Sequence, residues 1–441
     1  MPGARRVAFL TLAIVLVITI IALFLPPNAV LPTYKDKKAG KLGDKPLSAP
    51  DKDKPPEPLL RKPFYKATLN EIAPPIQDNF PLATSAKRSS DLPSVPHWNK
   101  PKHVRENTPL FIGFTRNWAI LQQAVVSYIT AGWPPEDIYV IENTGTMASN
   151  KRGQLTLQNP FYIDHRRLID VFGVNVITTP TLLTFAQLQN FFLFTATEND
   201  WPYYFWSHMD VVALPNERMN PYKSLYHSCV EVIRESMKPE YGRWAARFFA
   251  YDRLTLVNTA AYSEVGGFDP MIGFYATDCD FHERVAMYNY TMNDAFVGYI
   301  YDVGTSIPDL RVLYREDDAA SRGLCPKDTP MEKLQYGPGD CRFEALIRIL
   351  DEVQQVKNQH EGGRNFWQGN QAGGQGEPFF TDPEGFDIAI KMTIEHGKAV
   401  YKEKWGHDGC DLRNSGLGPE DAWRVEHDWD RPPRDGQVQV E

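Results

Sequence analysis

The feature that most constrains this chain is an alternation of short apolar segments with helix-like ones between residues 108 and 214. The apolar segments 108–115, 136–146 and 174–179 have the length of buried strands, and apolar residues at helical spacing separate the first two. A strand–helix–strand succession makes its strands parallel, because the crossover returns the chain to the same end of the sheet. We therefore predict a doubly wound, mixed α/β sheet with helices on both faces.

Segment 203–214, YYFWSHMDVVAL, is the most unusual strand of this series. His208 and Asp210 interrupt an aromatic and aliphatic run, and a buried carboxylate is costly unless it is paired or ligates a metal. One interpretation ends the strand at Ser207 and leaves Asp210 in a hydrated loop. The other places Asp210 at the carboxyl end of a parallel strand, where open α/β sheets bind ligands.

Two further polar groups have similar positions. Glu142, Asn143 and Thr144 follow the apolar run IYVI, and Asp278 and Asp280 begin the predicted helix in TDCDFHER. Strand ends of a doubly wound sheet lie along one edge, so we expect these groups to converge on one cleft. Several carboxylates in a cleft repel one another unless a cation neutralises them, and oxygen-rich sites suit Mg²⁺ or Mn²⁺.

The N-terminus has a distinct character. Residues 7–25 contain no charged side chain and are long enough to predict a membrane-spanning helix. Arg5 and Arg6 favour a cytosolic tail at residues 1–6. A cleaved signal peptide is the alternative, but the run exceeds the usual apolar core of such peptides and no good small-residue cleavage site follows.

The rest of the chain divides by composition. Residues 26–106 hold fifteen of the 35 prolines and no sustained periodicity, which predicts an extended stem. The predicted parts that follow are an α/β domain at 107–312, a helical C-terminal region at 313–420 with helices near 340–359 and 385–406, and a disordered tail at 421–441.

Charge and cysteine content exclude some classes. The net charge of −8 argues against non-specific nucleic-acid binding, which needs a basic face. The five cysteines fit no metal-binding spacing. In an oxidising lumen Cys325 and Cys341 could close a disulfide, whereas five free thiols in the cytosol are the alternative. Asn289 begins an N-glycosylation sequon, which we expect to lie in a helix near the chemistry and to be unused.

These segments together resemble the family 2 glycosyltransferases with a GT-A fold, in the form anchored by a single N-terminal helix. FIGFTRN stands where that family has its opening strand, YVIENTGT is similar to its base-contacting segment, and YYFWSHMDVVAL occupies the place of its DxD strand. VGGFDPMIGFYATDCDFHERV (265–285) resembles the family motif VGGFDE…EDxDLxxRL without a gap. The resemblance covers about residues 107–310.

The resemblance implies an inverting, metal-dependent glycosyltransferase of the hexosyltransferase class. It would move a sugar from a nucleotide-sugar donor to a glycan or glycoprotein hydroxyl, as a type II protein of the Golgi or endoplasmic reticulum membrane with its catalytic domain in the lumen. Asp278 matches the catalytic acidic position, with Asp280 as the alternative base or as a residue that positions substrate. The implied donor-binding residues are Thr115, Glu142, Asn143, His208, Asp210, Gly266 and Gly267.

The resemblance also implies a Mn²⁺ or Mg²⁺ cofactor on Asp210, with His208 and Asp302 as further ligands. The chain departs from the family at His208, where the first DxD carboxylate is expected, and at Thr277, where the family has Glu. A structural role for His208 and a turn-capping role for Asp302 are the alternatives. Gly266 and Gly267 fit a purely structural turn nearly as well as a donor contact.

Three other functions are alternatives for a chain with these features. An inactive, carbohydrate-binding relative would keep the fold while the changes at His208 and Thr277 removed catalysis. A nucleotidyltransferase would share the sheet and a metal-binding Asp, but it would usually carry a glycine-rich, basic loop after the first strand, and GFTRNWAIL has one glycine and one arginine. A structural membrane tether would leave the three polar strand ends unexplained.

Overall fold

The computed structural model describes residues 75–316, 323–359, 365–369, 371, 377–380 and 382–430. The predicted cytosolic tail, the predicted membrane helix at 7–25, most of the predicted stem and residues 431–441 lie outside these ranges. No helix within them combines the length and apolar character that a membrane span needs.

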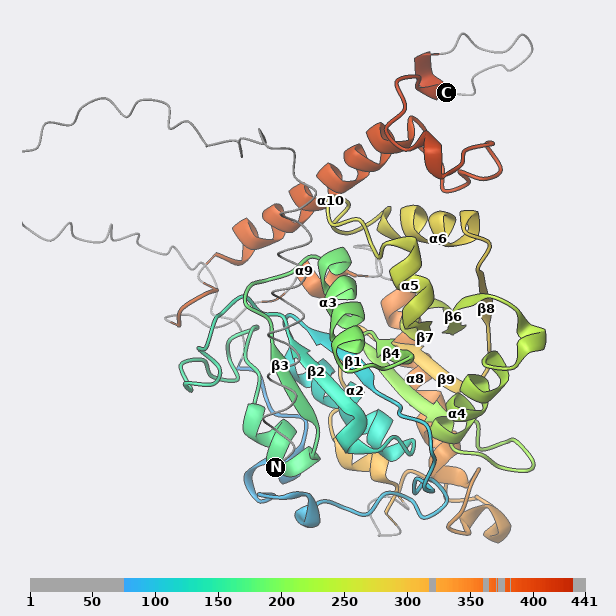
Figure 1. The fold of residues 1–441 in the computed structure, drawn as a ribbon. Coiled ribbons are helices and arrows are strands. Elements are labelled where there is room, and N and C mark those ends of the chain that lie inside the picture. The colour runs from blue at the N-terminus through green and yellow to red at the C-terminus, as the bar shows by residue number, and fades with distance from the viewer. Residues whose placement is uncertain are drawn as a thin grey trace, which may run out of the picture. The chain divides into compact units, whose positions relative to one another are not determined.

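A seven-stranded mixed sheet forms the centre of the described chain, in the order β3-β2-β1-β4-β7-β6-β8 (Figure 1). The first four of these strands are parallel, β7 runs antiparallel to both β4 and β6, and β8 is parallel to β6. The strands are β1 (Leu110–Phe114), β2 (Ile138–Glu142), β3 (Asn175–Thr178), β4 (Tyr203–Ser207), β6 (Trp244–Phe249), β7 (Leu254–Asn258) and β8 (Thr291–Asp294).

Helices cover both faces, as the alternation of segments predicts. The helices are α2 (Trp118–Thr130), the π-helix η4 (Arg167–Phe172), α3 (Phe185–Glu198), α4 (Leu225–Ser236), α5 (Thr259–Val265), α6 (Thr277–Met287), α8 (Cys341–Gln359), α9 (Phe366–Gly369) and α10 (Pro383–Trp405). Along β1, Leu110 and Ile112 join the core formed with α2 and α4, whereas Phe111 joins the core formed with α3, α5 and α6. The two-residue period of a strand thus sorts its side chains between two apolar layers.

The segment 203–214 is two strands rather than one. After β4, residues 208–210 turn the chain out of the central sheet, and β5 (Val211–Pro215) pairs antiparallel with β9 (Gly298–Asp302) in a separate two-stranded sheet. Val211 lies opposite Asp302 in this ladder, and the Val303 amide donates to the Asp210 carbonyl at 2.8 Å. The polar interruption therefore marks the point where the chain changes sheets.

Residues 75–106 differ from the extended stem predicted for them. Phe80 is 1% exposed and its ring centroid lies 5.5 Å from that of Phe172. The Asn79 and Asn99 side-chain amides donate to the carbonyls of Ala119 and Thr130 at 3.1 and 2.8 Å. A few apolar and amide side chains thus hold this proline-rich segment on the α2 layer, although it has no periodicity of its own.

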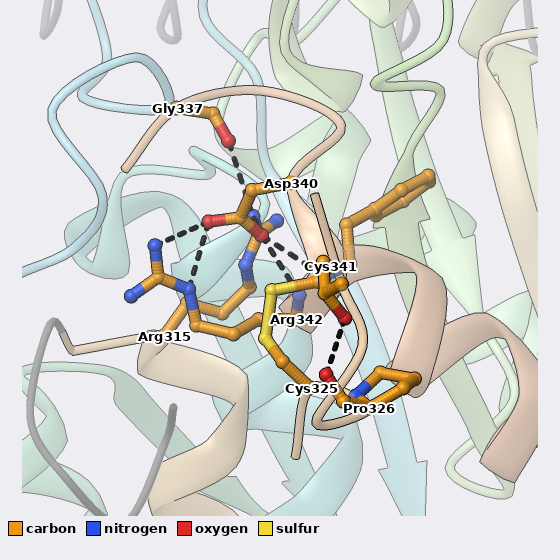
Figure 2. The surroundings of a disulfide bond; sticks show 9 residues. Arg315, Cys325, Pro326, Gly337, Asp340, Cys341 and Arg342 are labelled. Carbon is orange, nitrogen blue, oxygen red and sulfur yellow. Dashed lines mark hydrogen bonds and ion pairs between the residues drawn. A yellow bond between two sulfur atoms is a disulfide. The ribbon is translucent and has the colours of Figure 1, made fainter. Parts of the chain in front are cut away.

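The region before α8 contains a disulfide next to buried charges. Cys325 and Cys341 are bonded, which is the pairing considered from the sequence (Figure 2). Beside it, the Asp340 carboxylate accepts from Arg315 at 2.6 Å and from Arg342 at 2.5 Å, and all three side chains are nearly inaccessible (Figure 2). Buried charges need such pairing, so this network fixes the start of α8.

The C-terminal part of α10 is fastened to α6. A second disulfide joins Cys279 of α6 to Cys410, a pairing that no cysteine spacing in the sequence indicates. The segment 421–430 was predicted to be disordered, yet Arg424 donates to the carbonyls of Trp405 and Gly406, each at 2.8 Å. Charged contacts rather than apolar periodicity hold this segment, which is why its pattern resembles a tail.

Asn289 of the sequon lies just after α6 rather than inside a helix. Its side chain is exposed and its φ is 60°, in the left-handed region that Asn tolerates. The helical position that we expected to keep this sequon unused is therefore not observed.

His407 predicts a pH-dependent attachment of residues 419–430. Its ring nitrogens contact Asp428 at 2.7 Å and Asp411 at 2.9 Å, and Ser415 lies at 3.4 Å. Burial lowers the pKa of His407, but these two carboxylates outweigh burial and raise the pKa above its ordinary value. The stabilisation is therefore complete below a pH of about 6.5 and is lost as the pH rises through the raised pKa.

We expect hydrogen exchange in residues 419–430 to become faster as the pH rises from about 6.5 through the raised pKa of His407, after correction for intrinsic exchange. His407→Asn should exchange fast at every pH, because it lacks the ionisable ring. An equal pH response in both proteins would contradict this role of His407. The Arg424–Asp428 pair at 2.8 Å persists across the range and limits the size of the effect.

Candidate active site

A cavity of about 820 Å³ opens at the carboxyl ends of β1, β2 and β4. The residues directly after these three strands line it, as expected where parallel strands end at one edge. Of the predicted site residues, the cavity brings together Thr115, Asn143, His208, Asp210 and Asp278. Its other walls include Tyr251, Asp252, Tyr275 and Thr277, with Gln368 of α9 and Asp387 and Lys391 of α10.

Arg116 supplies a buried cation to the wall after β1. The residue is 7% exposed, its Nε donates to the Gln368 carbonyl at 3.0 Å, and its guanidinium lies 5.1 Å from the centroid of the Phe386 ring. Burial lowers the pKa of Arg116 to about 10, and the charge of Asp387 opposes that shift. The side chain is therefore still a cation at neutral pH.

The two predicted donor-binding residues at the end of β2 have different surroundings. Asn143 lines the cavity, with its amide bonded to both the N–H and the carbonyl of Leu183. Glu142 is 1% exposed and accepts from His165 at 2.7 Å, Asn150 at 2.8 Å and Thr178 at 2.9 Å. Burial raises the pKa of Glu142, but these donors outweigh burial and lower it. Glu142 is thus an ionised side chain that holds His165, Asn150 and Thr178 in place but does not line the cavity.

His208 lies between two carboxylates at the end of β4. Its Nδ1 is 3.6 Å from Asp210 Oδ1, its Nε2 is 3.5 Å from Asp252 Oδ2, and its ring stacks on Trp206 with centroids 5.4 Å apart. Burial lowers the pKa of His208, but the two carboxylates outweigh burial and raise it to about 10. Burial likewise raises the pKa of Asp210, yet His208 and Lys357 hold it well below its usual range.

A lysine from α8 contacts the two carboxylates predicted to bind metal. Lys357 Nζ lies 2.7 Å from Asp210 Oδ2, 2.5 Å from Asp302 Oδ1 and 3.3 Å from the Val303 carbonyl. The Lys357 side chain is 1% exposed, and those of Asp210 and Asp302 are 7% and 0% exposed. The β5–β9 ladder brings the two carboxylates together, and the lysine ammonium neutralises them.

The predicted metal ligands therefore do not fit a divalent ion. Asp210 and Asp302 each direct an oxygen at the Lys357 ammonium, and His208 lies between the carboxylates of Asp210 and Asp252. Across the described residues, no group of three His, Cys, Asp or Glu side chains has metal-binding geometry. In this structure the three residues predicted to bind Mn²⁺ form ion pairs with one another and with Lys357 and Asp252.

The two acidic residues of α6 have different surroundings. Asp278 is half-buried, lines the cavity and accepts from the Tyr251 hydroxyl at 3.4 Å. Asp280 is 0% exposed and accepts from Lys404 at 2.7 Å, from Trp405 Nε1 at 2.9 Å and from Arg284 Nη2 at 2.8 Å. Residues two positions apart on an α-helix point in directions about 200° apart around its axis. Asp278 therefore reaches the cavity and Asp280 does not.

Gly266 and Gly267 terminate α5 rather than line the cavity. Both have positive φ, at 92° and 67°, and the Gly267 carbonyl accepts from Arg284 at 2.7 Å. A Cβ at Gly267 would lie 2.5 Å from Asn190 Oδ1, so the position also requires close approach. Gly266 and Gly267 therefore form a structural turn, which was the alternative to a donor contact.

Some residues of the site were not identified from the sequence. Tyr251 and Tyr275 line the cavity and are each 52% exposed, and Arg116 was noted only as part of the first strand's end. The position of Lys357 in the sequence does indicate that it is buried. It continues the buried stripe of α8 formed by Phe343, Leu346 and Leu350, where a lone lysine needs a buried partner.

Comparison with known proteins gives distant structural matches. No family model matches the sequence, and no curated protein matches it. A mannosyltransferase from Pyrobaculum calidifontis, solved with GDP-Man and Mn²⁺, aligns with 68% of this chain and 75% of its own at 11% identity and a TM-score of 0.31.

Two further matches are similarly remote. TarS from S. aureus aligns with 68% of this chain and 56% of its own at 10% identity and a TM-score of 0.31. A cytidylyltransferase from Leptospira borgpetersenii aligns with 57% of this chain and 98% of its own at 9% identity and a TM-score of 0.30. At these TM-scores the similarities assign no activity to the chain.

Proposed function

We propose that this chain is a glycosyltransferase of the GT-A type, which moves a sugar from a nucleotide-sugar donor to a hydroxyl of a glycan or glycoprotein. One observation carries the proposal. The ends of β1, β2 and β4 and the start of α6 border one cavity, which holds a buried cation, Arg116, and an accessible carboxylate, Asp278. Open α/β sheets bind ligands at this edge, and glycosyl transfer needs both kinds of group.

The donor diphosphate would bind near Arg116. Its Nε donates to the Gln368 carbonyl, which fixes the guanidinium plane, and a guanidinium of fixed orientation can bind a phosphate through its remaining N–H groups. Lys391 lines the same cavity, where its ammonium pairs with Asp387 at 2.6 Å. The Arg116 cation would balance part of the negative charge that develops on the departing nucleoside diphosphate.

Asp278 would act as the general base. In the inverting reaction the acceptor oxygen attacks the anomeric carbon and forms the new C–O bond, while the bond from that carbon to the phosphate oxygen breaks. The electron pair of the broken bond leaves with the nucleoside diphosphate, and the acceptor proton moves to the Asp278 carboxylate. The Tyr251 hydroxyl at 3.4 Å orients that carboxylate, and no step passes through a metal.

The acceptor would bind against Tyr251 and Tyr275. Both rings line the cavity near Asp278 and are 52% exposed. The Tyr275 hydroxyl accepts from Asn365 Nδ2 at 2.7 Å, which limits the movement of its ring. Half-exposed, fixed aromatic rings offer the flat apolar surface on which sugar rings stack, which supports a carbohydrate acceptor.

The cellular location is part of the proposal. The disulfides Cys279–Cys410 and Cys325–Cys341 support an oxidising compartment, because cytosolic thiols are kept reduced. The uncharged run at 7–25 would anchor the chain as a type II protein of the Golgi or endoplasmic reticulum membrane, with the catalytic domain in the lumen.

A panel of nucleotide sugars, tested on the purified full chain, checks the proposed activity. We expect release of the nucleoside diphosphate from one donor, faster in the presence of a matching glycan acceptor. Glycan binding without turnover of any donor would indicate the inactive, carbohydrate-binding alternative. Formation of a nucleotide sugar and pyrophosphate from a sugar phosphate and a nucleoside triphosphate would indicate a nucleotidyltransferase. Either result would contradict the proposal.

A further inference from the structure

The ammonium of Lys357 is built into the sheet edge beside the cavity. Among the described residues, its acceptors are Asp210 Oδ2 at 2.7 Å, Asp302 Oδ1 at 2.5 Å and the Val303 carbonyl at 3.3 Å. An ammonium has three N–H donors, so these three acceptors match its full capacity. The contact is therefore a complete binding site for one monovalent cation, and the chain itself provides that cation.

A second contact fixes the lysine in place. Gln354 lies three residues before Lys357 on α8, and its Oε1 accepts from the Asp302 backbone N–H at 3.0 Å. Side chains three residues apart lie on the same helix face, so α8 contacts β9 through both of them. The register of α8 against β9 thus determines where the ammonium lies.

The same geometry disfavours a divalent ion. Mn²⁺ or Mg²⁺ on Asp210 and Asp302 would share its oxygen ligands with a buried ammonium at contact distance. Like charges a few ångströms apart repel strongly where water is excluded. The Lys357 side chain is 1% exposed and packs from α8 against β9, so the ammonium is not in contact with bulk solvent.

We propose that Lys357 takes the place of a divalent metal, so that the chain binds its donor without Mn²⁺ or Mg²⁺ at Asp210 and Asp302. The inference rests on the proposed glycosyltransferase function and specifies how its donor site is charged. Lys357 does not line the cavity and acts through Asp210, which does line it. Lys357 is therefore a positioning residue.

Mn²⁺ binding to the purified full chain tests the inference without any donor. Electron paramagnetic resonance of free Mn²⁺ should detect no site that depends on Asp210. In addition, the affinities for UDP and GDP should differ by less than about twofold between EDTA and excess Mn²⁺. One Mn²⁺ bound per chain and lost in Asp210→Asn would overturn the inference, as would an affinity that falls at least about tenfold in EDTA.

Lys357→Ser gives a readout that a purely structural lysine would not move. The variant leaves two buried carboxylates without their ammonium, so its melting temperature should fall. Mn²⁺ should raise that temperature again, because the carboxylates then accept a divalent ion. Lys398→Ser removes an exposed lysine that pairs only with Glu395 among the described residues. Its melting temperature should neither fall nor rise when Mn²⁺ is added.

Two outcomes separate the inference from the function on which it rests. If Mn²⁺ raises the melting temperature of the wild type as much as it raises that of Lys357→Ser, the inference is overturned. If Lys357→Ser does not fold, the measurements on the wild type still decide. If no nucleotide sugar is turned over, the proposed function fails, whereas the Mn²⁺ titration still reports on Lys357.

Discussion

Asp278→Asn is expected to lower kcat for sugar transfer by about 10²- to 10⁴-fold, the range typical for removal of a general base. The amide has nearly the shape of the carboxylate but cannot accept the acceptor proton. Asp278 is half-buried, and its contact with Tyr251 is long at 3.4 Å, so little stability depends on its charge. Steady-state kinetics, together with a melting curve, measure the two effects separately.

The matched control for this variant is Asn365→Ala, which loses one hydrogen bond to Tyr275 at the acceptor side of the cavity. That change should raise KM for the acceptor more than it lowers kcat, because it affects binding rather than proton transfer. An Asp278→Asn protein with wild-type kcat would remove Asp278 from the mechanism. A loss of nucleotide affinity equal to the loss of kcat would instead assign Asp278 to donor binding.

Asp280→Ala is expected to lower the free energy of unfolding by about 3–5 kcal/mol, the cost of breaking a buried ion pair. The substitution leaves the cations of Arg284 and Lys404 without their shared carboxylate, and Trp405 Nε1 loses its acceptor. Because Asp280 is 0% exposed, water cannot replace these contacts. Chemical denaturation followed by circular dichroism measures the change.

Glu395→Ala is the comparison for Asp280→Ala. Glu395 pairs with Lys398 on the exposed face of α10, and such a pair contributes about 0–1 kcal/mol. A similar small change for Asp280→Ala would show that the buried network does not hold α6 against α10. Per folded molecule, Asp280→Ala should keep far more activity than Asp278→Asn, although the two residues are neighbours in the sequence.

The alternating core of the fold was predictable from local patterns. The parallel strands β1, β2 and β3 follow from short apolar runs of strand length, and the helices α3 and α10 follow from apolar residues at helical spacing. The end of β4 at Ser207 was one of the two interpretations of 203–214, but the second strand was not predicted, because both halves are apolar and only the pairing of β5 with β9 separates them. Residues 75–106 pack through isolated side chains such as Phe80, which leave no periodic signal.

The site was predictable in part. Strand ends correctly indicated the edge where Thr115, Asn143, His208 and Asp210 meet. Motif similarity alone did not distinguish Asp278 from Asp280, whereas their angular separation on a helix does. The ion pair of Lys357 with Asp210 joins positions 147 residues apart. No local pattern reports such a contact, although a lysine on the apolar stripe of α8 indicates that a partner exists.

The most direct measurement of the central claim is a structure of the full chain with the nucleoside diphosphate that the donor panel selects. We predict that the diphosphate lies in the cavity at the ends of β1 and β4, with a phosphate on the Arg116 guanidinium, Asp278 facing the sugar position, and Lys357 still on Asp210. A nucleotide bound outside this cavity would contradict the claim that this sheet edge is the donor site.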